Sequence, residues 1–390
     1  MRADPILPTN LLAARGRSGE PSTRAELVQR TFRAVEPHLE GLSSSFFGHL
    51  FDIAPETREL FPVNLHHERS RLPRALLHIV QSVDRIDQLQ PFLEQLGREH
   101  RKFGLLGWHV EALGTALLAA VRELAGEAWT EDVERAWAEA FGIVAECVQT
   151  AITAATTEPA VYHAQVVEHE RIGWDVARIR VRTDERLPYQ AGQYVSVEIP
   201  QRPRLWRYLS PANAPAPDGV VEFHVRSVPG GWVSRAMVAH SRVGDIWRLG
   251  APLGRLHQSN TAQNVLMVAG GTGVAPIKAM LEELARRGRP PRTHVFFGGR
   301  TWDDLYCLPV LRAMADDQPW LDVTPVVERP DGRPGAEIGT LADVVSRYGA
   351  WLDHDVIVSG SPAMIRTTVT ALLVAGTPMD RISYDPFAVE

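Results

Sequence analysis

The sequence predicts a multidomain fold in which an all-α domain is followed by an antiparallel β-barrel and then by an α/β domain. Apolar residues recur at helical spacing over the first part of the chain, up to about residue 155. Six strand-like stretches follow, and beyond residue 264 apolar runs alternate with helical segments. A length of 390 residues gives each of two or three domains room for its own core. The boundaries that we expect are a disordered leader over 1–22, then domains over 23–157, 158–260 and 261–390.

The composition is that of a soluble globular protein, with 45% hydrophobic and 23% charged residues. A net charge of -6 gives no electrostatic reason to expect a nucleic-acid partner. Cys147 and Cys307 lie far apart without a metal-binding spacing, which favours a reducing cytoplasm over a disulfide framework. No apolar run reaches the roughly 18 residues of a membrane span, and the N-terminus lacks a signal-peptide core. The composition leaves the oligomeric state open.

The first domain is expected to hold seven or eight crossing helices. The segment from Thr23 to Glu26 is a capping-box pattern, and apolar residues then follow at steps of four, three and four, as on one face of a helix. Pro73 lies inside one expected helix and should remove a hydrogen bond or kink it. The remaining helices are expected around Phe46–Phe51, over Pro55–Phe61, Ser70–Val83, Pro91–Phe103 and Trp108–Leu124, and from Thr130 to about Ala155.

A single histidine is the candidate metal ligand of this domain. His100 lies near a helix end, within the stretch from Leu96 to Gly104. Neutral imidazole is a good iron ligand, and one axial histidine leaves the opposite face of a heme open. From the residues alone, a surface histidine in a charged turn is the favoured interpretation.

Three segments in order, Phe46–Phe51, Pro55–Pro62 and Leu96–Gly104, resemble the globin domain of bacterial flavohemoglobins. The resemblance implies a heme b with His100 as the iron ligand. It also places Phe61 flat on the heme and makes Leu72 the apolar residue over the distal face.

Four positions depart from that family. Phe47 stands where a distal tyrosine donates a hydrogen bond to bound dioxygen, and Glu68 where a distal glutamine assists. Val110 and Ala154 stand where a tyrosine and a glutamate polarise the ligand histidine. A donor stabilises the partial negative charge on bound dioxygen, and a carboxylate on the histidine raises its basicity. We therefore expect weakened binding and activation of dioxygen.

Two alternatives stay open around the distal side. Glu68 is either a pocket residue, which donates a hydrogen bond only when protonated, or a carboxylate that points to solvent. His66 and His67 either supply a sixth iron ligand or face water, and we favour water.

The second domain is expected to contain six short strands, separated by turn residues such as Gly192, Pro200 and Gly219, as in a small antiparallel barrel. The strands are expected over Tyr162–Glu168, Trp174–Arg182, Tyr194–Ile199, Trp206–Leu209, Val220–Val228 and Asp245–Leu249.

The stretch from Arg207 to Ser210 is suited to a flat anionic cofactor. On a strand Arg207 and Leu209 face one way, whereas Tyr208 and Ser210 face the other. The set offers a cation, an aromatic plane and a hydroxyl, although an arginine–tyrosine pair on a strand more often belongs to a plain surface.

A glycine pair farther on opens a short helix, whose free amides suit a phosphate. Tyr194, the Arg207–Ser210 stretch and this turn occur in the order of the FAD domain in the ferredoxin–NADP reductase superfamily, which they resemble. The resemblance implies that Tyr208 stacks on the isoalloxazine and that Ser210 lies at its reactive nitrogen. Arg207 and the turn residues would hold the FAD pyrophosphate, the turn being Gly231, Trp232, Val233 and Ser234.

The third domain begins with the apolar run Val265–Ala269, followed by a glycine-rich turn and a helix. A glycine turn by itself is a weak signal, but strand, turn, helix and a trailing proline together resemble the nicotinamide-binding half of the same reductases. The residues expected to hold NAD(P)H are Gly270, Gly271, Thr272, Gly273 and Pro276.

Two further positions complete the implied reductase. Ser359 and Gly360 stand where the family usually has a cysteine–glycine pair near the nicotinamide. Phe387 matches an aromatic residue that covers the flavin. No arginine pair marks a site for a 2′-phosphate, although Arg300 could reach one, so NADH is weakly preferred over NADPH.

Together these resemblances imply that electrons pass from NAD(P)H through FAD to heme, and that dioxygen and nitric oxide are the ligands. The family reaction is the dioxygenation of nitric oxide to nitrate. The atypical pocket residues leave two alternatives: reduction of another heme ligand or soluble acceptor, and a heme-based gas or redox sensor whose reductase resets the iron.

Overall fold

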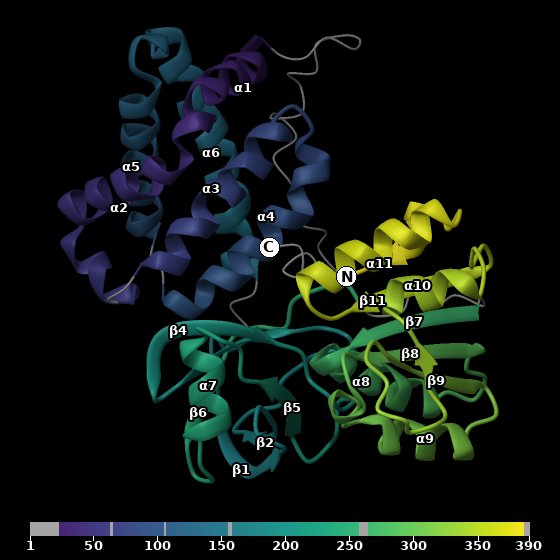
Figure 1. Cartoon of the computed structure of the whole chain (residues 1–390). Coiled ribbons are helices and arrows are strands. Elements are labelled where there is room, and N and C mark those ends of the chain that lie inside the picture. Colours follow the sequence, from purple (N-terminus) through teal and green to yellow (C-terminus); the bar gives the residue numbers. More distant parts are fainter. Residues whose placement is uncertain (1–22, 63–64, 105–106, 155–157, 257–263, 386–390) are drawn as a thin grey trace, which may run out of the picture. The chain divides into compact units, whose positions relative to one another are not determined.

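The computed structural model describes residues 23–62, 65–104, 107–154, 158–256 and 264–385. It separates into two compact units, Met1–Glu158 and Pro159–Glu390 (Figure 1). The expected leader over 1–22 lies outside the described residues. None of the described helices is both long and apolar enough to cross a membrane.

Every regular element among the described residues of the first unit is a helix, as predicted. Helices α2 and α5 pack together, and α4 packs along α6. A Cβ on Gly97 of α4 would lie 2.7 Å from the carbonyl oxygen of Val148, so only glycine lets these two helices approach so closely. The helices are α1 (Thr23–Val35), α2 (Leu39–Ile53), α3 (His66–Gln81), α4 (Ile86–His100), α5 (Gly107–Ala125) and α6 (Glu131–Ala154), with short 3-10 turns at Glu36–His38, Pro55–Leu60, Arg101–Phe103 and Gly126–Ala128.

Two helix starts differ from the prediction. The helix expected from Pro91 begins at Ile86, and the one expected from Ser70 begins at His66. Because proline is common at the start of a helix, the predicted start of α4 was placed at Pro91. Pro91 instead lies inside α4, where the surrounding turns tolerate the missing amide donor.

The second unit begins with the predicted antiparallel barrel. Its strands lie in the order β4-β3-β6-β1-β2-β5, and every neighbouring pair is antiparallel. Trp247, Phe223 and Tyr162 fill its core. The elements are β1 (Tyr162–Ile172), β2 (Val176–Thr183), β3 (Val195–Ile199), β4 (Arg202–Leu209), β5 (Val220–Arg226), α7 (Trp232–Ala239) and β6 (Ile246–Leu249).

Two predicted strand starts were wrong: β4 begins at Arg202 and not at Trp206, and β2 begins later than predicted. Trp174 is not in a strand but in the turn between β1 and β2, where it is 81% exposed. Gly173, with φ at 82°, makes this turn, and β2 begins only at Val176.

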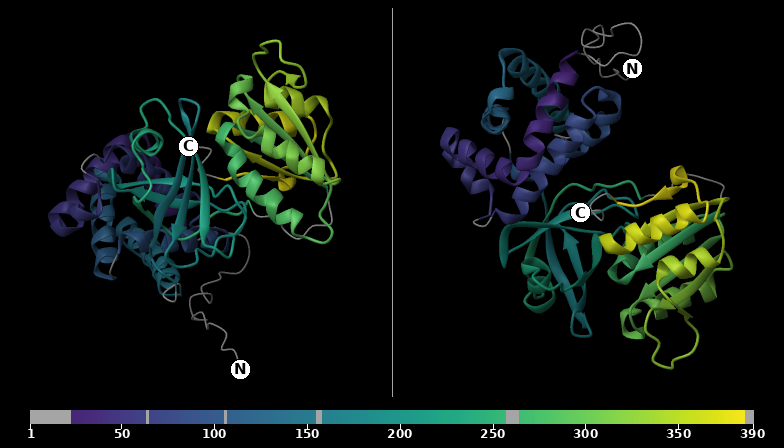
Figure 2. Two further views of the ribbon diagram at one scale, coloured as in Figure 1. Left: turned by 90° about the horizontal axis from the view of Figure 1, so that it is seen from below. Right: turned by 45° about the horizontal axis from the view of Figure 1, so that its top comes forward.

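The unit continues with a parallel sheet in the order β10-β9-β8-β7-β11-β12. Alternate residues of β7 pack on opposite faces: Met267 contacts the core that includes α8 and α9, and Val268 the core that includes α10 and α11. Helices thus lie on both faces of this sheet (Figure 2). The elements are β7 (Asn264–Gly270), α8 (Val274–Ala285), β8 (Thr293–Gly299), α9 (Leu308–Asp317), β9 (Leu321–Val327), β10 (Glu337–Ile338), α10 (Leu341–Arg347), β11 (His354–Ser359), α11 (Pro362–Val374) and β12 (Ile382–Ser383).

The strand order places a switch point at β7. The chain leaves β7 for β8 on one side, and β11 later pairs with its other side. Ligands of open α/β sheets bind outside the carboxyl ends of the strands at such a point. The glycine turn at Gly271–Gly273 lies there.

Candidate cofactor sites

His100 is the last residue of α4, and two contacts fix the orientation of its ring. Its Nδ1 lies 2.7 Å from the carbonyl oxygen of Leu96, one turn back in the helix. The ring also packs edge-to-face on Phe103, with 5.8 Å between centroids. A proton on Nδ1 that is donated to this carbonyl leaves Nε2 with its lone pair. This half-buried histidine therefore has the tautomer and the support that an iron ligand needs.

The residues predicted for the distal side come together in one apolar core. Phe47 is only 4% exposed, and its ring packs edge-to-face on Phe61 at 5.2 Å and on Phe46 at 5.1 Å. Leu72 packs on the same core from α3. Arg58 holds the segment that carries Phe61, because its Nη1 donates to the carbonyl oxygens of Phe61 and Pro62 at 3.3 and 2.9 Å. These side chains form an apolar wall.

The other predicted pocket positions stay predictions. Glu68, His66 and His67 lie in α3, but their side chains are outside the described set. Val110 is half-buried in α5, and Ala154 is exposed at the end of α6.

The Arg207–Ser210 stretch lies on β4, which pairs only with β3 and so forms an edge of the barrel sheet. Tyr208 packs edge-to-face on the buried Tyr194, with 5.0 Å between centroids. Arg207 Nη1 donates to the carbonyl oxygen of Trp206 at 2.8 Å, and Leu209 packs against the barrel core. Two residues predicted for the flavin, Tyr194 and Tyr208, are thus in direct contact.

Sequence reasoning missed two residues beside Tyr194. A Cβ on Gly254, where φ is 92°, would lie 2.8 Å from the Tyr194 ring and 3.0 Å from Oδ1 of Asp385. Asp385 is only 4% exposed, and burial raises its pKa to about 7, against the opposing effect of a hydrogen bond from the Arg255 amide. A positive-φ glycine and a buried carboxyl therefore lie next to Tyr194, one of the two aromatic residues predicted for the flavin.

The turn before α7 is closed by Gly231. A Cβ there would lie 2.5 Å from Cγ2 of Val228 and 2.6 Å from Oγ of Ser234. Ser234 Oγ accepts a hydrogen bond from the Val228 amide at 3.3 Å, which leaves its own proton to donate. Val233 is buried in the barrel core, so it offers only backbone groups to a phosphate.

Residues predicted for the nicotinamide from separate segments come together at the switch point. A Cβ on Gly273 would lie 2.4 Å from the carbonyl oxygen of Ser359 and 2.6 Å from the Cα of Gly360. Gly271 adopts a φ of 54°, and Pro276 is buried in the first turn of α8. Thr272 is half-buried between the glycines. The arrangement lets backbone approach a dinucleotide closely.

Two positions near the nucleotide site remain predictions. Arg300 is exposed just after β8, and Phe387 lies outside the described residues.

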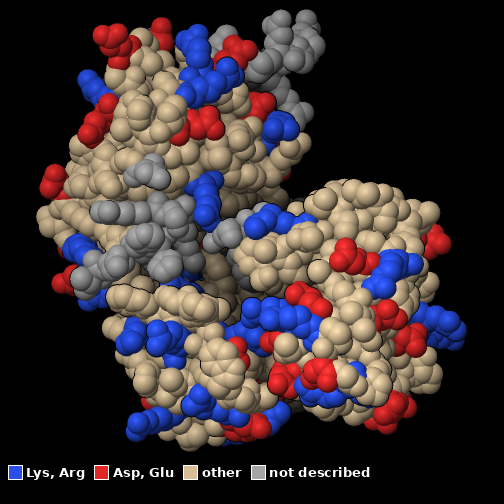
Figure 3. Space-filling model, viewed as in Figure 1, with Lys and Arg blue, Asp and Glu red and all other residues tan. Residues whose placement is uncertain are grey.

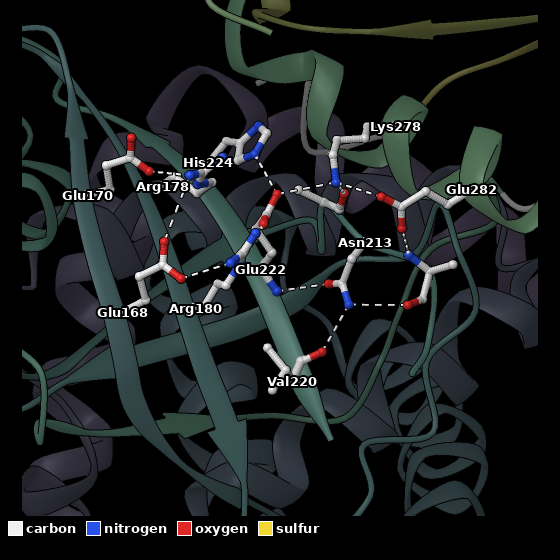
Figure 4. Close-up of polar contacts among 12 residues, drawn as sticks. Glu168, Glu170, Arg178, Arg180, Asn213, Val220, Glu222, His224, Lys278 and Glu282 are labelled. Atoms are coloured by element: carbon white, nitrogen blue, oxygen red, sulfur yellow. Dashed lines mark hydrogen bonds and ion pairs between the residues drawn. The ribbon is translucent and has the colours of Figure 1, made fainter. Parts of the chain in front are cut away.

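A buried polar network between barrel and parallel sheet was also missed by sequence reasoning. Its centre is Glu222 on β5, which is 4% exposed (Figure 4). Burial raises its pKa, but the hydrogen bond to His224, the charge of Lys278 and the hydrogen bond from Arg180 outweigh this and lower the pKa to about 2. The available signal was Glu222 and His224 among the apolar residues of β5, which ends at a third polar residue, Arg226.

Basic and acidic side chains lie interspersed over the face of the molecule drawn in Figure 3.

Comparison with known proteins identifies the domains in which these candidate sites lie. A globin family model matches residues 44–148, an oxidoreductase FAD-binding domain 163–258, and an oxidoreductase NAD-binding domain 267–370. The chain is 28% identical to the flavohemoprotein of Chromobacterium violaceum, covering 93% of this chain and 96% of that relative. It is 32% identical to the ferredoxin–NAD(P)+ reductase component of the naphthalene 1,2-dioxygenase system of Pseudomonas putida, covering 59% of this chain and 70% of that relative.

A solved structure has the same fold over nearly the whole chain. It is a flavohemoglobin from Malassezia yamatoensis with bound FAD and heme, at a TM-score of 0.80 and 17% identity, covering 94% of this chain and 99% of that one.

These findings define the class of the protein: an NAD(P)H-dependent oxidoreductase in which a globin precedes FAD- and NAD-binding domains. Its cofactors are heme b, FAD and NAD(P)H, and electrons pass from NAD(P)H through FAD to heme. Over almost its whole length the chain is similar to flavohemoglobins in sequence and in fold.

Proposed function

We propose that the chain converts nitric oxide and dioxygen to nitrate at its heme. The observation that carries this proposal is the apolar wall of Phe47, Phe61 and Leu72 in a globin that also holds a helix-end histidine with a fixed ring. Small neutral gases enter an apolar pocket without loss of hydrogen bonds to water, whereas ions and larger polar molecules pay for desolvation.

The roles of the globin residues follow from their chemistry. Heme iron supplies the binding of dioxygen and the one-electron chemistry. His100 offers Nε2 to the iron while the Leu96 carbonyl holds Nδ1. Phe61 and Leu72 exclude water from the gas site. Phe47 contributes packing but no hydrogen bond, since its side chain carries no donor.

The roles of the reductase residues follow in the same way. Arg207 and the turn before α7 would bind the FAD pyrophosphate, while Tyr208 would cover the flavin ring. Ser210 offers a hydroxyl to the flavin edge. The backbone of Gly270–Gly273 would bind the nicotinamide dinucleotide at the switch point.

A second candidate function is the reduction of another heme ligand or of a soluble acceptor. Two observations favour it: Phe47 gives bound dioxygen no hydrogen bond, and the acceptor at Nδ1 of His100 is a neutral carbonyl. Both weaken the stabilisation of a negatively charged ligand relative to pockets with a tyrosine and a carboxylate.

Rapid mixing of the oxygenated protein with nitric oxide separates the two candidates. Nitric oxide dioxygenation should give one nitrate per heme within the mixing experiment. Rapid autoxidation without nitrate would refute the proposal and favour the second candidate. An optical spectrum with NADH under carbon monoxide is the control, because a ferrous carbonyl band shows that electrons reach the heme whichever reaction follows.

A further inference from the structure

A buried lysine joins the barrel to the parallel sheet beside the flavin and nicotinamide sites. Lys278 lies on α8 and is only 9% exposed. Its Nζ lies 2.9 Å from the carbonyl oxygen of Ala212, 2.7 Å from Oε1 of Glu282 and 3.3 Å from Oε1 of Glu222. Figure 4 shows the side chain reaching from α8 toward the strand that carries Glu222. Two hydrogen bonds and one ion pair thus surround a single ammonium group.

The segments that Lys278 connects adjoin the two predicted cofactor sites. Ala212 follows Ser210, the last residue of the flavin stretch, by two positions. Lys278 follows Gly273, the last glycine of the nicotinamide turn, by five positions on the helix that this turn begins. One side chain therefore spans from the flavin loop to the nicotinamide helix.

Neighbouring contacts repeat this connection. Glu282, one turn farther along α8, accepts a hydrogen bond from the Ala214 amide at 2.8 Å. Tyr306 bonds to Nδ1 of His224 at 3.0 Å, and Arg226 bonds to Asp304 at 2.6 Å. Hydrogen bonds and ion pairs thus connect the barrel to the nucleotide-binding domain. We call these contacts, which join Glu222 to Lys278, Ala214 to Glu282, His224 to Tyr306 and Arg226 to Asp304, the seam. Because they are directional, they restrict the relative position of the two domains more than apolar packing alone would.

The charges around Lys278 restrict where its ammonium group can lie. Glu222 accepts from Arg180 at 2.8 Å through Oε2, and its Oε1 faces both His224 and Lys278. A buried carboxylate or ammonium that loses its partner carries a desolvation cost that the fold cannot recover elsewhere. The helix is therefore held at the one distance at which Lys278 meets both the carboxylate and the Ala212 carbonyl.

We propose that Lys278 is a positioning residue for hydride transfer, which sets the separation between the nicotinamide and flavin rings. In this step the hydride leaves C4 of NADH with its electron pair and bonds to N5 of FAD, so NADH is oxidised to NAD+ and the flavin is reduced. Lys278 exchanges no proton in the step. The proposal rests on the reductase activity and not on nitric oxide chemistry, so a chain that makes no nitrate still tests it.

The test is anaerobic stopped-flow reduction of the flavin by NADH in the full-length holoprotein, with Lys278→Met as the variant. A misplacement of about 1 Å costs a reaction on the order of 100-fold, so the limiting rate should fall roughly 10- to 100-fold. FAD content and the dissociation constant for NADH should change by less than about threefold. The charge-transfer band of the reduced flavin with NAD+ should weaken, because it depends on ring contact.

Two further variants keep the outcome interpretable. Arg287→Met removes an exposed cation just beyond α8 and should leave the limiting rate unchanged. If Lys278→Met does not fold, Glu222→Gln combined with Lys278→Met removes both charges of the Glu222–Lys278 pair. Glu282 then keeps the Ala214 amide and Arg180 keeps Glu168, and the limiting rate should again be slow. A holoprotein variant with wild-type limiting rate and charge-transfer band, or one whose loss lies wholly in NADH affinity, would overturn the proposal.

Discussion

Replacement of Asp385 by asparagine should change how the stability of the reductase depends on pH. The carboxyl is buried beside Gly254 and Tyr194, and its pKa is raised from 3.8 to about 7. Between these two values the folded chain holds a proton that the unfolded chain has released, so the free energy of unfolding falls as pH rises. A shift of about three pKa units corresponds to about 4 kcal/mol, lost between pH 4 and pH 7 and level above pH 7.

An asparagine keeps the shape and the hydrogen bonding of the protonated acid but does not titrate. Asp385→Asn should therefore be more stable than wild type above pH 7, and the advantage should shrink toward pH 5. Thermal release of FAD from the full-length holoprotein, followed by flavin fluorescence between pH 5 and 8.5, measures this difference. Asp380→Asn is the matched control, since it removes an exposed carboxyl from the same unit. Parallel pH profiles for Asp385→Asn and wild type would refute the reasoning.

Three other substitutions test separate sites. Glu222→Gln should remove the acid sensitivity that wild type gains as pH falls from 4.5 to about 2, a difference of about 3 kcal/mol in the free energy of unfolding, measured by acid titration of flavin release. Phe47→Tyr should slow dioxygen dissociation roughly 10- to 100-fold by adding a hydrogen bond, and an unchanged rate in carbon monoxide displacement would show that Phe47 is not distal. Gly273→Ala should raise the dissociation constant for NADH at least tenfold, on the order of 1.4 kcal/mol, because its Cβ would meet the Ser359 carbonyl at 2.4 Å. FAD content should be retained, and an unchanged NADH titration would contradict the predicted nicotinamide site.

Patterns of local spacing predicted the fold well, because burial on one face repeats within a helix or strand. The errors lie where a single residue decides a boundary, as at Trp174 beyond the Gly173 turn and at Pro91 inside α4. Sequence analysis could predict that candidate site residues lie together where they form one continuous motif, as Arg207–Ser210 does.

Contacts between distant segments were not predictable in this way. Glu222 and Lys278 are 56 positions apart, each within an apolar element, and nothing in either element indicates the other. Asp385 and Gly254 likewise meet only because the chain returns to the barrel after β12. The role of Glu68 in the heme pocket remains a prediction.

The seam around Lys278 also determines which part of this chain can be exchanged with a relative. A chimera that joins this barrel to a foreign nucleotide domain at residues 257–263 would separate Glu222 from Lys278, Ala214 from Glu282 and Arg226 from Asp304. Each separation would leave a buried or half-buried charge facing a side chain selected for another partner. The modular unit for engineering is therefore the whole of residues 159–390, with the junction placed between Glu158 and Pro159.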